Sequence, residues 1–209
     1  MPGNLYLTTA EFTAFGLADS TDPALIRVVS DLVDAYCQRD SLLVAQYSDR
    51  NRLPDGLPVT RTRVTPLAMV APATTPFISV RARHGIPRGS GGLATLAELL
   101  APFGGPPTWV DLTPSQVEHH AATGEVWLPA SLYGGVYTEV EITYNAGFSQ
   151  VPENAKLACA QMIRNIESHP AASVREARLD RLKLAYFQHS LLDEDVRRLL
   201  SPFVAVRLN

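Results

Sequence analysis

The stretch that decides the fold is EVEITYNAGFSQVPENAKLACAQM, residues 139–162. Between residues 140 and 144 apolar side chains alternate with polar ones, which predicts a β-strand with one buried face. Gly147 permits a tight turn after that strand, and Phe148 can pack beneath the turn. Pro152 favours the first turn of a helix, because its fixed φ suits that position. The stretch therefore predicts a strand, a tight turn and a helix in direct succession.

Helical spacing of apolar residues marks both ends of the chain. Thr8 and Glu11 form a predicted capping box, and Gly16 is expected to end that first short helix. Asp22 and Pro23 are expected to begin a longer helix. The two predicted apolar helix faces consist of Leu25, Ile26, Val29, Leu32, Val33 and Tyr36 near the N-terminus, and of Ala155, Ala158, Cys159, Met162, Ile163 and Ile166 after the proline.

The middle of the chain is predicted to be rich in β-structure. Residues 59–64 and 77–83 each alternate and each place two arginines on one face, so we expect a hairpin or a pair of arms. Other elements expected are helices over 41–47, 93–101 and 173–192, a short helix after the acidic residues 193–195, and strands over 109–112, 125–129 and 136–144.

We therefore predict an α+β protein that is mainly α. Its core is a small helical bundle formed by residues 1–58 and 145–201, with residues 59–144 as a β-rich insertion that carries the hairpin or arm. Residues 202–209 form a short, mostly apolar tail without a partner in the sequence. A content of 46% hydrophobic and 19% charged residues is typical of a globular chain, which excludes a disordered one.

The formal net charge of −3 conceals a strong partition along the chain. Residues 59–92 hold five arginines and no acidic residue, whereas residues 93–155 hold seven acidic residues and no Lys or Arg. Guanidinium groups bind carboxylates and phosphates through paired hydrogen bonds. Three interpretations are open: pairing with the chain's own acidic segment, pairing with that segment on a neighbouring subunit, and contact with nucleic acid. The arginines concerned are Arg61, Arg63, Arg81 and Arg83.

No catalytic motif is recognisable in the sequence, and no phosphate loop of the form GxxxxGK[ST] occurs. His119 and His120 follow Glu118, but adjacent histidines point to different faces and no third metal ligand stands at a suitable spacing. Cys37 and Cys159 both fall in helical patterns and are expected to be buried free thiols. We therefore predict a non-enzymatic protein without a metal or cofactor.

No export or membrane-spanning segment is expected. The start of the chain lacks a basic segment followed by an apolar one. The longest uncharged stretch, residues 64–80, contains three prolines, whereas a membrane helix needs about 20 mostly apolar residues. We expect the chain to stay in the cytosol or to assemble there into something larger, without membrane contact.

The stretch at residues 139–162 resembles the tailed-phage head–tail connector family, whose members are also called adaptor or head-completion proteins and include gene-transfer-agent relatives. The family pattern is a strand ending in Tyr-x-x-Gly-Tyr/Phe, a short turn to a proline, and a helix with alanines on its inner face. Tyr144, Gly147, Phe148 and Pro152 stand at the matching positions.

Both ends of the chain resemble the same family, in the Asp-Ala-Tyr of residues 34–36 and in DVRRLLSPFVAVRL at residues 195–208. The resemblance implies a structural virion protein: a subunit of a ring, commonly of twelve, that docks under the portal in the phage neck. The ring extends the DNA channel and carries the next neck, stopper or tail protein, after viral assembly in the host cytoplasm. The portal-docking residues that it implies are Phe203, Val204, Ala205, Val206, Arg207, Leu208 and Asn209.

The alternative hypothesis is a nucleic-acid-binding module that uses the arginine-bearing β-hairpin. Its binding would weaken steeply with added salt, because phosphate contacts release counterions. In the ring hypothesis the same arginines would instead contact neighbouring copies of the chain, or touch genomic DNA in the channel without sequence preference.

Overall fold

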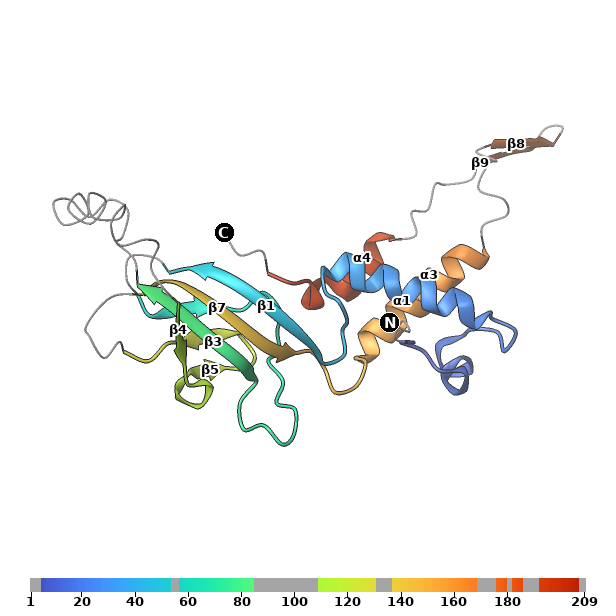
Figure 1. The fold of residues 1–209 in the computed structure, drawn as a ribbon. Coiled ribbons are helices and arrows are strands. Elements are labelled where there is room, and N and C mark those ends of the chain that lie inside the picture. Colours follow the sequence, from blue (N-terminus) through green and yellow to red (C-terminus); the bar gives the residue numbers. More distant parts are fainter. Residues whose placement is uncertain are drawn as a thin grey trace. The chain divides into compact units, whose positions relative to one another are not determined.

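The computed structural model folds into two compact units. The helical unit consists of residues 1–42 and 150–204, and the β unit consists of residues 43–149 and 205–209. The chain therefore passes between the units three times (Figure 1). The structure describes residues 5–53, 57–84, 109–130, 137–168 and 192–206, together with the backbone of residues 176–179 and 182–185.

Side-chain caps explain where two of the helices of the helical unit begin. The Asp22 carboxylate accepts the Ala24 N–H at 2.8 Å, as expected for a helix that opens with proline. Asp193 accepts the Val196 N–H at 2.8 Å in the same way. The α-helices of the described residues are α1 (Pro23–Cys37), α3 (Glu153–Glu167) and α4 (Glu194–Leu200), and the short 3-10 turns of this unit are η1 (Thr9–Glu11), η2 (Thr13–Phe15) and η5 (Ser201–Phe203).

The predicted start of the chain is confirmed in its capping, although the helical turns are 3-10 rather than α. Glu11 accepts the Thr8 N–H at 2.9 Å, and Gly16 ends η2 at a φ of +70°. Helix α3 packs against both α1 and α4. The predicted inner face of α3 is confirmed from Ala155 to Ile163, where the alanines allow close approach of the neighbouring helices.

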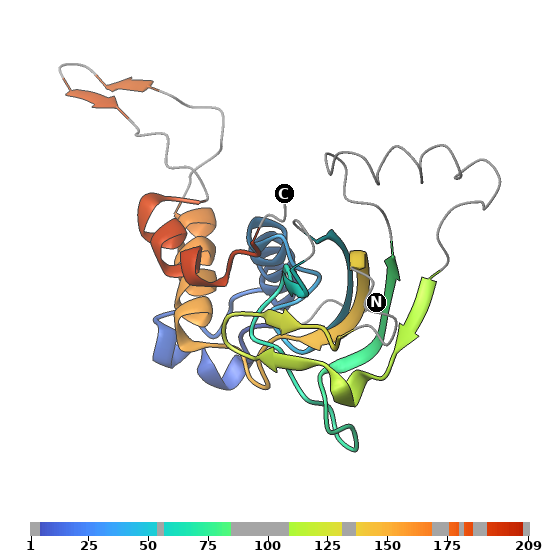
Figure 2. The same cartoon turned by 90° about the vertical axis from the view of Figure 1, so that its left-hand side faces the viewer.

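The β unit contains seven strands in two antiparallel sheets within its described residues. Figure 2 shows the two sheets curving around a shared interior. The four-stranded sheet has the order β1-β7-β3-β4, formed by Ala45–Arg52, Tyr137–Ala146, Phe77–His84 and Trp109–Leu112. The three-stranded sheet has the order β2-β6-β5, formed by Val59–Arg61, Glu125–Trp127 and Glu118–His120, with the short turn η4 (Pro114–Gln116) before β5.

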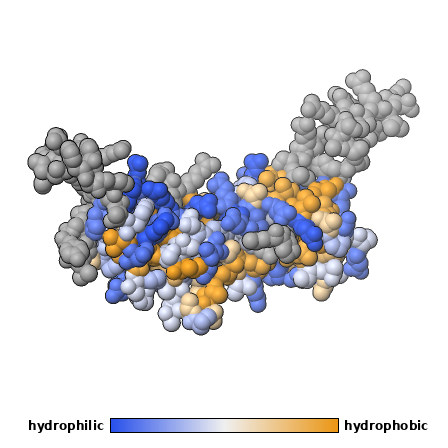
Figure 3. Space-filling view, viewed as in Figure 1, coloured by the Kyte–Doolittle hydropathy of each residue, from blue (hydrophilic) through white to orange (hydrophobic). Residues whose placement is uncertain are grey.

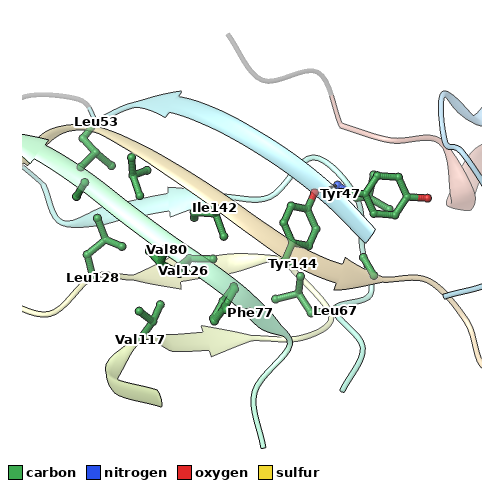
Figure 4. Packing of buried hydrophobic residues seen from close by; sticks show 14 of the residues in the cluster. Tyr47, Leu53, Leu67, Phe77, Val80, Val117, Val126, Leu128, Ile142 and Tyr144 are labelled. Carbon is green, nitrogen blue, oxygen red and sulfur yellow. Dashed lines mark hydrogen bonds between the residues drawn. The ribbon is translucent and has the colours of Figure 1, made fainter. Parts of the chain in front are cut away.

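A loop of residues 62–76 connects β2 to β3 and projects from the strands of the β unit (Figure 1). Figure 3, in the same view, shows hydrophobic residues exposed on this projection. The core of the unit lies between the two sheets (Figure 4). Tyr144, Ile142 and Phe77 contribute from the first sheet, and Val126 and Leu128 from the second or its end.

The prediction of a mainly α fold is wrong, because the described residues hold a β-rich structure with seven strands in the two antiparallel sheets. The expected hairpin is also wrong. β2 pairs with β6, whereas β3 pairs with β7 and β4, so the two arginine-bearing strands lie in different sheets. β2 and β3 each pair with strands that are distant along the chain, and local alternation does not indicate such partners.

Two predicted helices are strands instead. The segment expected as a helix over 41–47 leads into β1, and the segment expected over 173–192 holds β8 (Glu176–Leu179) and β9 (Leu182–Ala185) in antiparallel register. In EARLDRLKL, residues 176–184, apolar and charged residues alternate on each side of Asp180 and Arg181, which is a strand period. The helix expected over 93–101 lies outside the described residues.

Candidate functional site

One face of the four-stranded sheet carries two rows of charged residues. The register places Arg50 opposite Glu141, which itself lies opposite Arg81. Asp111 on β4 lies opposite Arg81 and ends this first row. The second row lies beside the first and begins at Arg52 on β1. The second row consists of Arg52, Glu139, Arg83 and Trp109.

The charges within these rows are paired. Glu139 accepts hydrogen bonds from Arg83 at 2.7 Å and from Arg50 at 2.8 Å, and Glu141 accepts one from Arg81 at 2.8 Å. The hydrogen bonds from Arg83 and then Arg50 hold the pKa of Glu139 below its ordinary value. Arg52 lies farther off, with its Nε 4.0 Å from Glu139 Oε1.

Three arginines of the two rows lie close to the ring of Trp109. The guanidinium carbons of Arg50, Arg81 and Arg83 lie 5.3, 5.3 and 5.2 Å from the centre of its ring. Guanidinium groups stack favourably on tryptophan at such distances. The sequence alone did not single out Trp109 or Arg50, because their neighbourhood exists only in the register of four strands.

The other two predicted arginines lie elsewhere. Arg61 on β2 donates to Glu125 on β6 at 2.6 Å, and the Arg63 Nε lies 3.6 Å from Asp49. The interpretation as pairing with the chain's own acidic segment is thus confirmed for Arg61, Arg81 and Arg83. Since β2 and β3 belong to different sheets, the hairpin that would present all four arginines to nucleic acid does not form.

Buried polar side chains join the two sheets where β1 meets the segment containing β2. Asn51 donates from its side-chain amide to the Arg61 carbonyl at 2.8 Å and to the Thr60 hydroxyl at 2.9 Å. Asp49 accepts the Arg63 N–H at 2.7 Å. These two side chains of β1 satisfy backbone and hydroxyl groups that a neighbouring strand would otherwise pair with.

The motif residue Tyr144 completes this junction. Its hydroxyl donates to Asp49 at 2.6 Å and accepts the Val64 N–H at 3.1 Å. Burial and the adjacent Asp49 carboxylate raise the pKa of the Tyr144 phenol above its ordinary value. The Tyr144 side chain therefore stays neutral within the core and links Asp49 to the backbone of Val64 by hydrogen bonds.

The remaining motif residues shape the exit from β7. Gly147 has a φ of +128°, and its N–H donates to the Pro66 carbonyl at 2.9 Å. Phe148 accepts the Val44 N–H at 3.2 Å through its carbonyl. Pro152 caps α3, and its carbonyl accepts the Ala155 N–H at 2.9 Å. The predicted order of strand, turn and helix is confirmed.

The predicted portal-docking residues divide between the two units. Phe203 is buried in the helical unit, whereas Ala205 is buried in the core of the β unit. The Val206 N–H donates to the Arg63 carbonyl at 2.9 Å, and Val206 itself is half exposed. Residues 207–209 lie outside the described residues.

The helical unit holds a buried polar pair. The Tyr6 hydroxyl donates to the Asp34 carboxylate and accepts the Leu42 N–H at 2.7 Å. Burial raises the pKa of Asp34 to about 6, although the hydrogen bond from Tyr6 offsets part of the effect. Burial also raises the pKa of Cys37 to about 11 and that of Cys159 to about 12, and both are free thiols.

The described parts of the chain contain no group of three or more His, Cys, Asp or Glu side chains placed to hold a metal ion. His119 packs edge-on against Phe77, while His120 faces Thr123, whose hydroxyl lies 3.0 Å from its Nδ1. The two histidines thus point to different faces, as predicted. Among the helices that could be searched, none combines the length and the apolar content needed to cross a membrane.

No protein-family model and no curated protein matches the chain. Among solved structures, the fold is similar to that of a chain in a structure titled "Virion of native gene transfer agent (GTA) particle". The TM-score is 0.50 at 15% sequence identity, and the match covers 98% of this chain and 92% of that chain. The similarity at this identity is one of fold, and it extends over both units.

Proposed function

We propose that this chain is a structural virion protein of a phage-like particle and that it serves as the head–tail adaptor. In this role it forms a ring of twelve under the portal, extends the DNA channel and offers a platform for the next neck, stopper or tail protein. It acts in the virion neck after assembly in the host cytoplasm, as a structural protein and not as an enzyme. The observation that carries the proposal is the similarity in fold, over nearly the whole of both chains, to a chain of the gene-transfer-agent virion.

The strand–turn–helix motif supports the proposal from a second direction. Tyr144, Gly147 and Phe148 belong to the β unit, and Pro152 opens the helical unit. The residues that resemble the connector family therefore stand where the chain passes from one unit to the other. The motif therefore has a structural role, which is to connect the two units.

The C-terminal segment is the proposed portal contact, and its burial decides how to test it. Deleting everything from Phe203 onward would remove two buried residues, Phe203 and Ala205, and would test folding rather than docking. A chain that ends at Val206 keeps both of these buried residues. The polar and apolar contacts of Arg207, Leu208 and Asn209 with the portal would then be lost selectively.

The experiment combines the chain with the portal protein of the same particle and examines the mixture by electron microscopy. We expect an additional ring of density on one end of the portal, and loss of that ring for the chain that ends at Val206. Far-UV circular dichroism of the shortened chain serves as the folding control. Intact portal rings without added density at high concentrations of the full chain would contradict the adaptor proposal.

A further inference from the structure

Four arginines form an array on the outer face of the four-stranded sheet. Arg50 and Arg52 lie on β1, and Arg81 and Arg83 lie on β3, with β7 between the two strands. Residues two apart on a strand are separated by about 7 Å, and strands on either side of a third are separated by about 10 Å. The array therefore extends in two directions, and we name these four residues the arginine face.

The carboxylates of β7 lie beneath the guanidinium groups of the arginine face. The side chains of Glu139 and Glu141 are only 15% and 25% exposed. The side chains on the strands beside them are 56% exposed at Arg50, 78% at Arg52 and 45% at Arg81. An approaching ligand therefore meets guanidinium groups before it meets these two carboxylates.

The guanidinium groups are held in place before any ligand binds. Carboxylates of β7 accept hydrogen bonds from Arg50, Arg81 and Arg83 at 2.8, 2.8 and 2.7 Å. The ring of Trp109 lies within 5.3 Å of the guanidinium carbons of the same three arginines. Groups that are already ordered lose less entropy when they bind a ligand.

Most N–H groups of the arginine face are left for a ligand by the described residues. A guanidinium group has five N–H donors. Arg50 donates two of them to Glu139, and Arg81 donates one to Glu141. The Arg52 Nε lies 4.0 Å from the nearest Glu139 oxygen, which is beyond hydrogen-bond distance.

The residues around the arginine face suit phosphate groups. The next row of the same sheet face carries hydroxyl groups, at Ser48, Thr143 and Ser79. Serine and threonine hydroxyls contact phosphates in protein–DNA complexes, as arginine does. Asp111 is exposed at the β4 end of the face, opposite Arg81. Four guanidinium groups thus stand against three carboxylates, two of which are covered.

We propose that the arginine face binds the phosphate backbone of double-stranded DNA without sequence preference. Duplex DNA carries about one phosphate per 1.7 Å of its axis, so an array in two directions meets several phosphates at once. Guanidinium groups bind phosphates through paired hydrogen bonds. The inference goes beyond the proposed function, because a ring can surround DNA without binding it. The arginines also differ from the four expected from the sequence, since Arg50 and Arg52 take the places of Arg61 and Arg63.

Fluorescence anisotropy of a labelled duplex of mixed sequence tests the proposal on the full chain. We expect binding at low salt that weakens steeply as salt is added. Arg52→Ala should weaken binding roughly threefold or more, and should make the slope of log K against log salt less steep by about 0.9. The Arg52 side chain forms no hydrogen bond with the described residues, so its removal leaves the fold intact.

Arg61→Ala is the matched control for Arg52→Ala. Arg61 is 54% exposed and pairs with Glu125, but it lies on the other sheet. Its removal should leave both the affinity and the salt slope unchanged. Asp111→Asn should instead tighten binding by about twofold or more, because it removes the exposed carboxylate of the face.

Two results with DNA would overturn the proposal. One is absence of binding by the native chain at low salt, and the other is an equal loss of affinity in Arg61→Ala and Arg52→Ala. Polyglutamate that binds as tightly as DNA would also overturn it, since the face would then fit an acidic protein.

Trp109 reports binding at the arginine face directly. The chain has two tryptophans, so Trp127→Phe leaves Trp109 as the only one. Its emission should change during titration with DNA, with the same midpoint as the anisotropy. Unchanged emission at saturating DNA would place the binding elsewhere on the chain and refute the proposal.

Binding to the portal separates this inference from the proposed function. The native chain and Arg52→Ala are each mixed with the portal and examined by electron microscopy. If both complete a ring but bind DNA equally well, the arginine face is refuted and the adaptor role stands. If DNA binding depends on Arg52 but no ring forms on the portal, the adaptor role fails and the DNA-binding face stands.

Discussion

The Tyr144 hydroxyl donates a hydrogen bond of 2.6 Å to the Asp49 carboxylate inside the β unit. Asp49 also accepts the Arg63 N–H at 2.7 Å, and the carbonyl of Arg63 accepts the Val206 N–H at 2.9 Å. One tyrosine on β7 is thereby connected to β1, to the segment after β2 and to the end of the described chain. Tyr144 thus has a definite physical task, which is to anchor a buried carboxylate.

Replacing Tyr144 with Phe should destabilise the β unit by about 1–3 kcal/mol, because Asp49 and the Val64 N–H each lose a buried partner. Urea unfolding followed by tryptophan fluorescence measures the change. Tyr137→Phe is the control, since its ring stacks on His84 and phenylalanine keeps that contact. Equal unfolding midpoints for the two variants would show that the hydroxyl of Tyr144 contributes nothing.

Replacing Gly147 with Ala should cost more than about 3 kcal/mol or prevent folding. A Cβ at this position would lie 2.4 Å from the Leu43 carbonyl oxygen, and the φ of +128° is reserved for glycine. Gly16→Ala is the matched control, because its φ is +70° but the nearest atom to a Cβ is 3.7 Å away. We expect it to cost only about 1–2 kcal/mol in a thermal melt. A Gly147→Ala chain as stable as Gly16→Ala would refute the steric argument.

Replacing Asp34 with Asn should make the helical unit less sensitive to pH. The folded pKa of about 6 exceeds the ordinary 3.8, so folding favours the protonated carboxyl. Its stabilisation is complete below pH 4 and is lost as the pH rises through 6. The variant should therefore be more stable than the native chain at pH 7 by about 1–2 kcal/mol, allowing for solvent screening, and should match it near pH 4.

The measurement for Asp34 is urea unfolding between pH 4 and pH 8, followed by circular dichroism. Asp31→Asn, on the exposed side of α1, is the control for the loss of one negative charge. An unchanged gap between the native chain and Asp34→Asn across this range would mean that Asp34 titrates normally.

Replacing Glu139 with Gln should destabilise the β unit by about 0.5–1 kcal/mol at neutral pH, because Arg83 and Arg50 lose a shared carboxylate. The lowered pKa means that this stabilisation is present above the ordinary value of 4.5 and is lost as the pH falls through the folded value. The native and variant chains should thus converge in acid. Glu118→Gln on β5 provides the comparison, and convergence in alkali instead would contradict the assignment.

The strand–turn–helix stretch could be predicted because its signals are local. Alternation fixed the buried face of β7, Gly147 supplied the turn, and Pro152 set the start of α3. β1 could not be predicted in the same way. Its buried side chains include Asp49 and Asn51. Burial therefore alternates along the strand, whereas apolar and polar residue types do not alternate in the sequence.

The charged face shows the same limit at longer range. Pairing of the arginines with acidic residues was one of the open interpretations of the sequence, but the partners of Arg81 and Arg83 are set by the register of β3 on β7. The stacking on Trp109 depends on β4 as well, which follows β3 only after residues 85–108. Alternation in a single strand says which face a side chain takes and not which strand will lie beside it.

The chain enters and leaves the β unit at adjacent points. Leu43 forms a bridge with Phe148, and the Val44 N–H donates to the Phe148 carbonyl at 3.2 Å. Because its two ends meet, the β unit can be gained, enlarged or exchanged in evolution as an inserted domain, while the helical unit stays intact. The third passage of the chain between the units adds a constraint on such an exchange. Ala205, from the C-terminal segment, is buried in the core of the β unit. A domain that replaced the β unit would therefore need a site that buries Ala205.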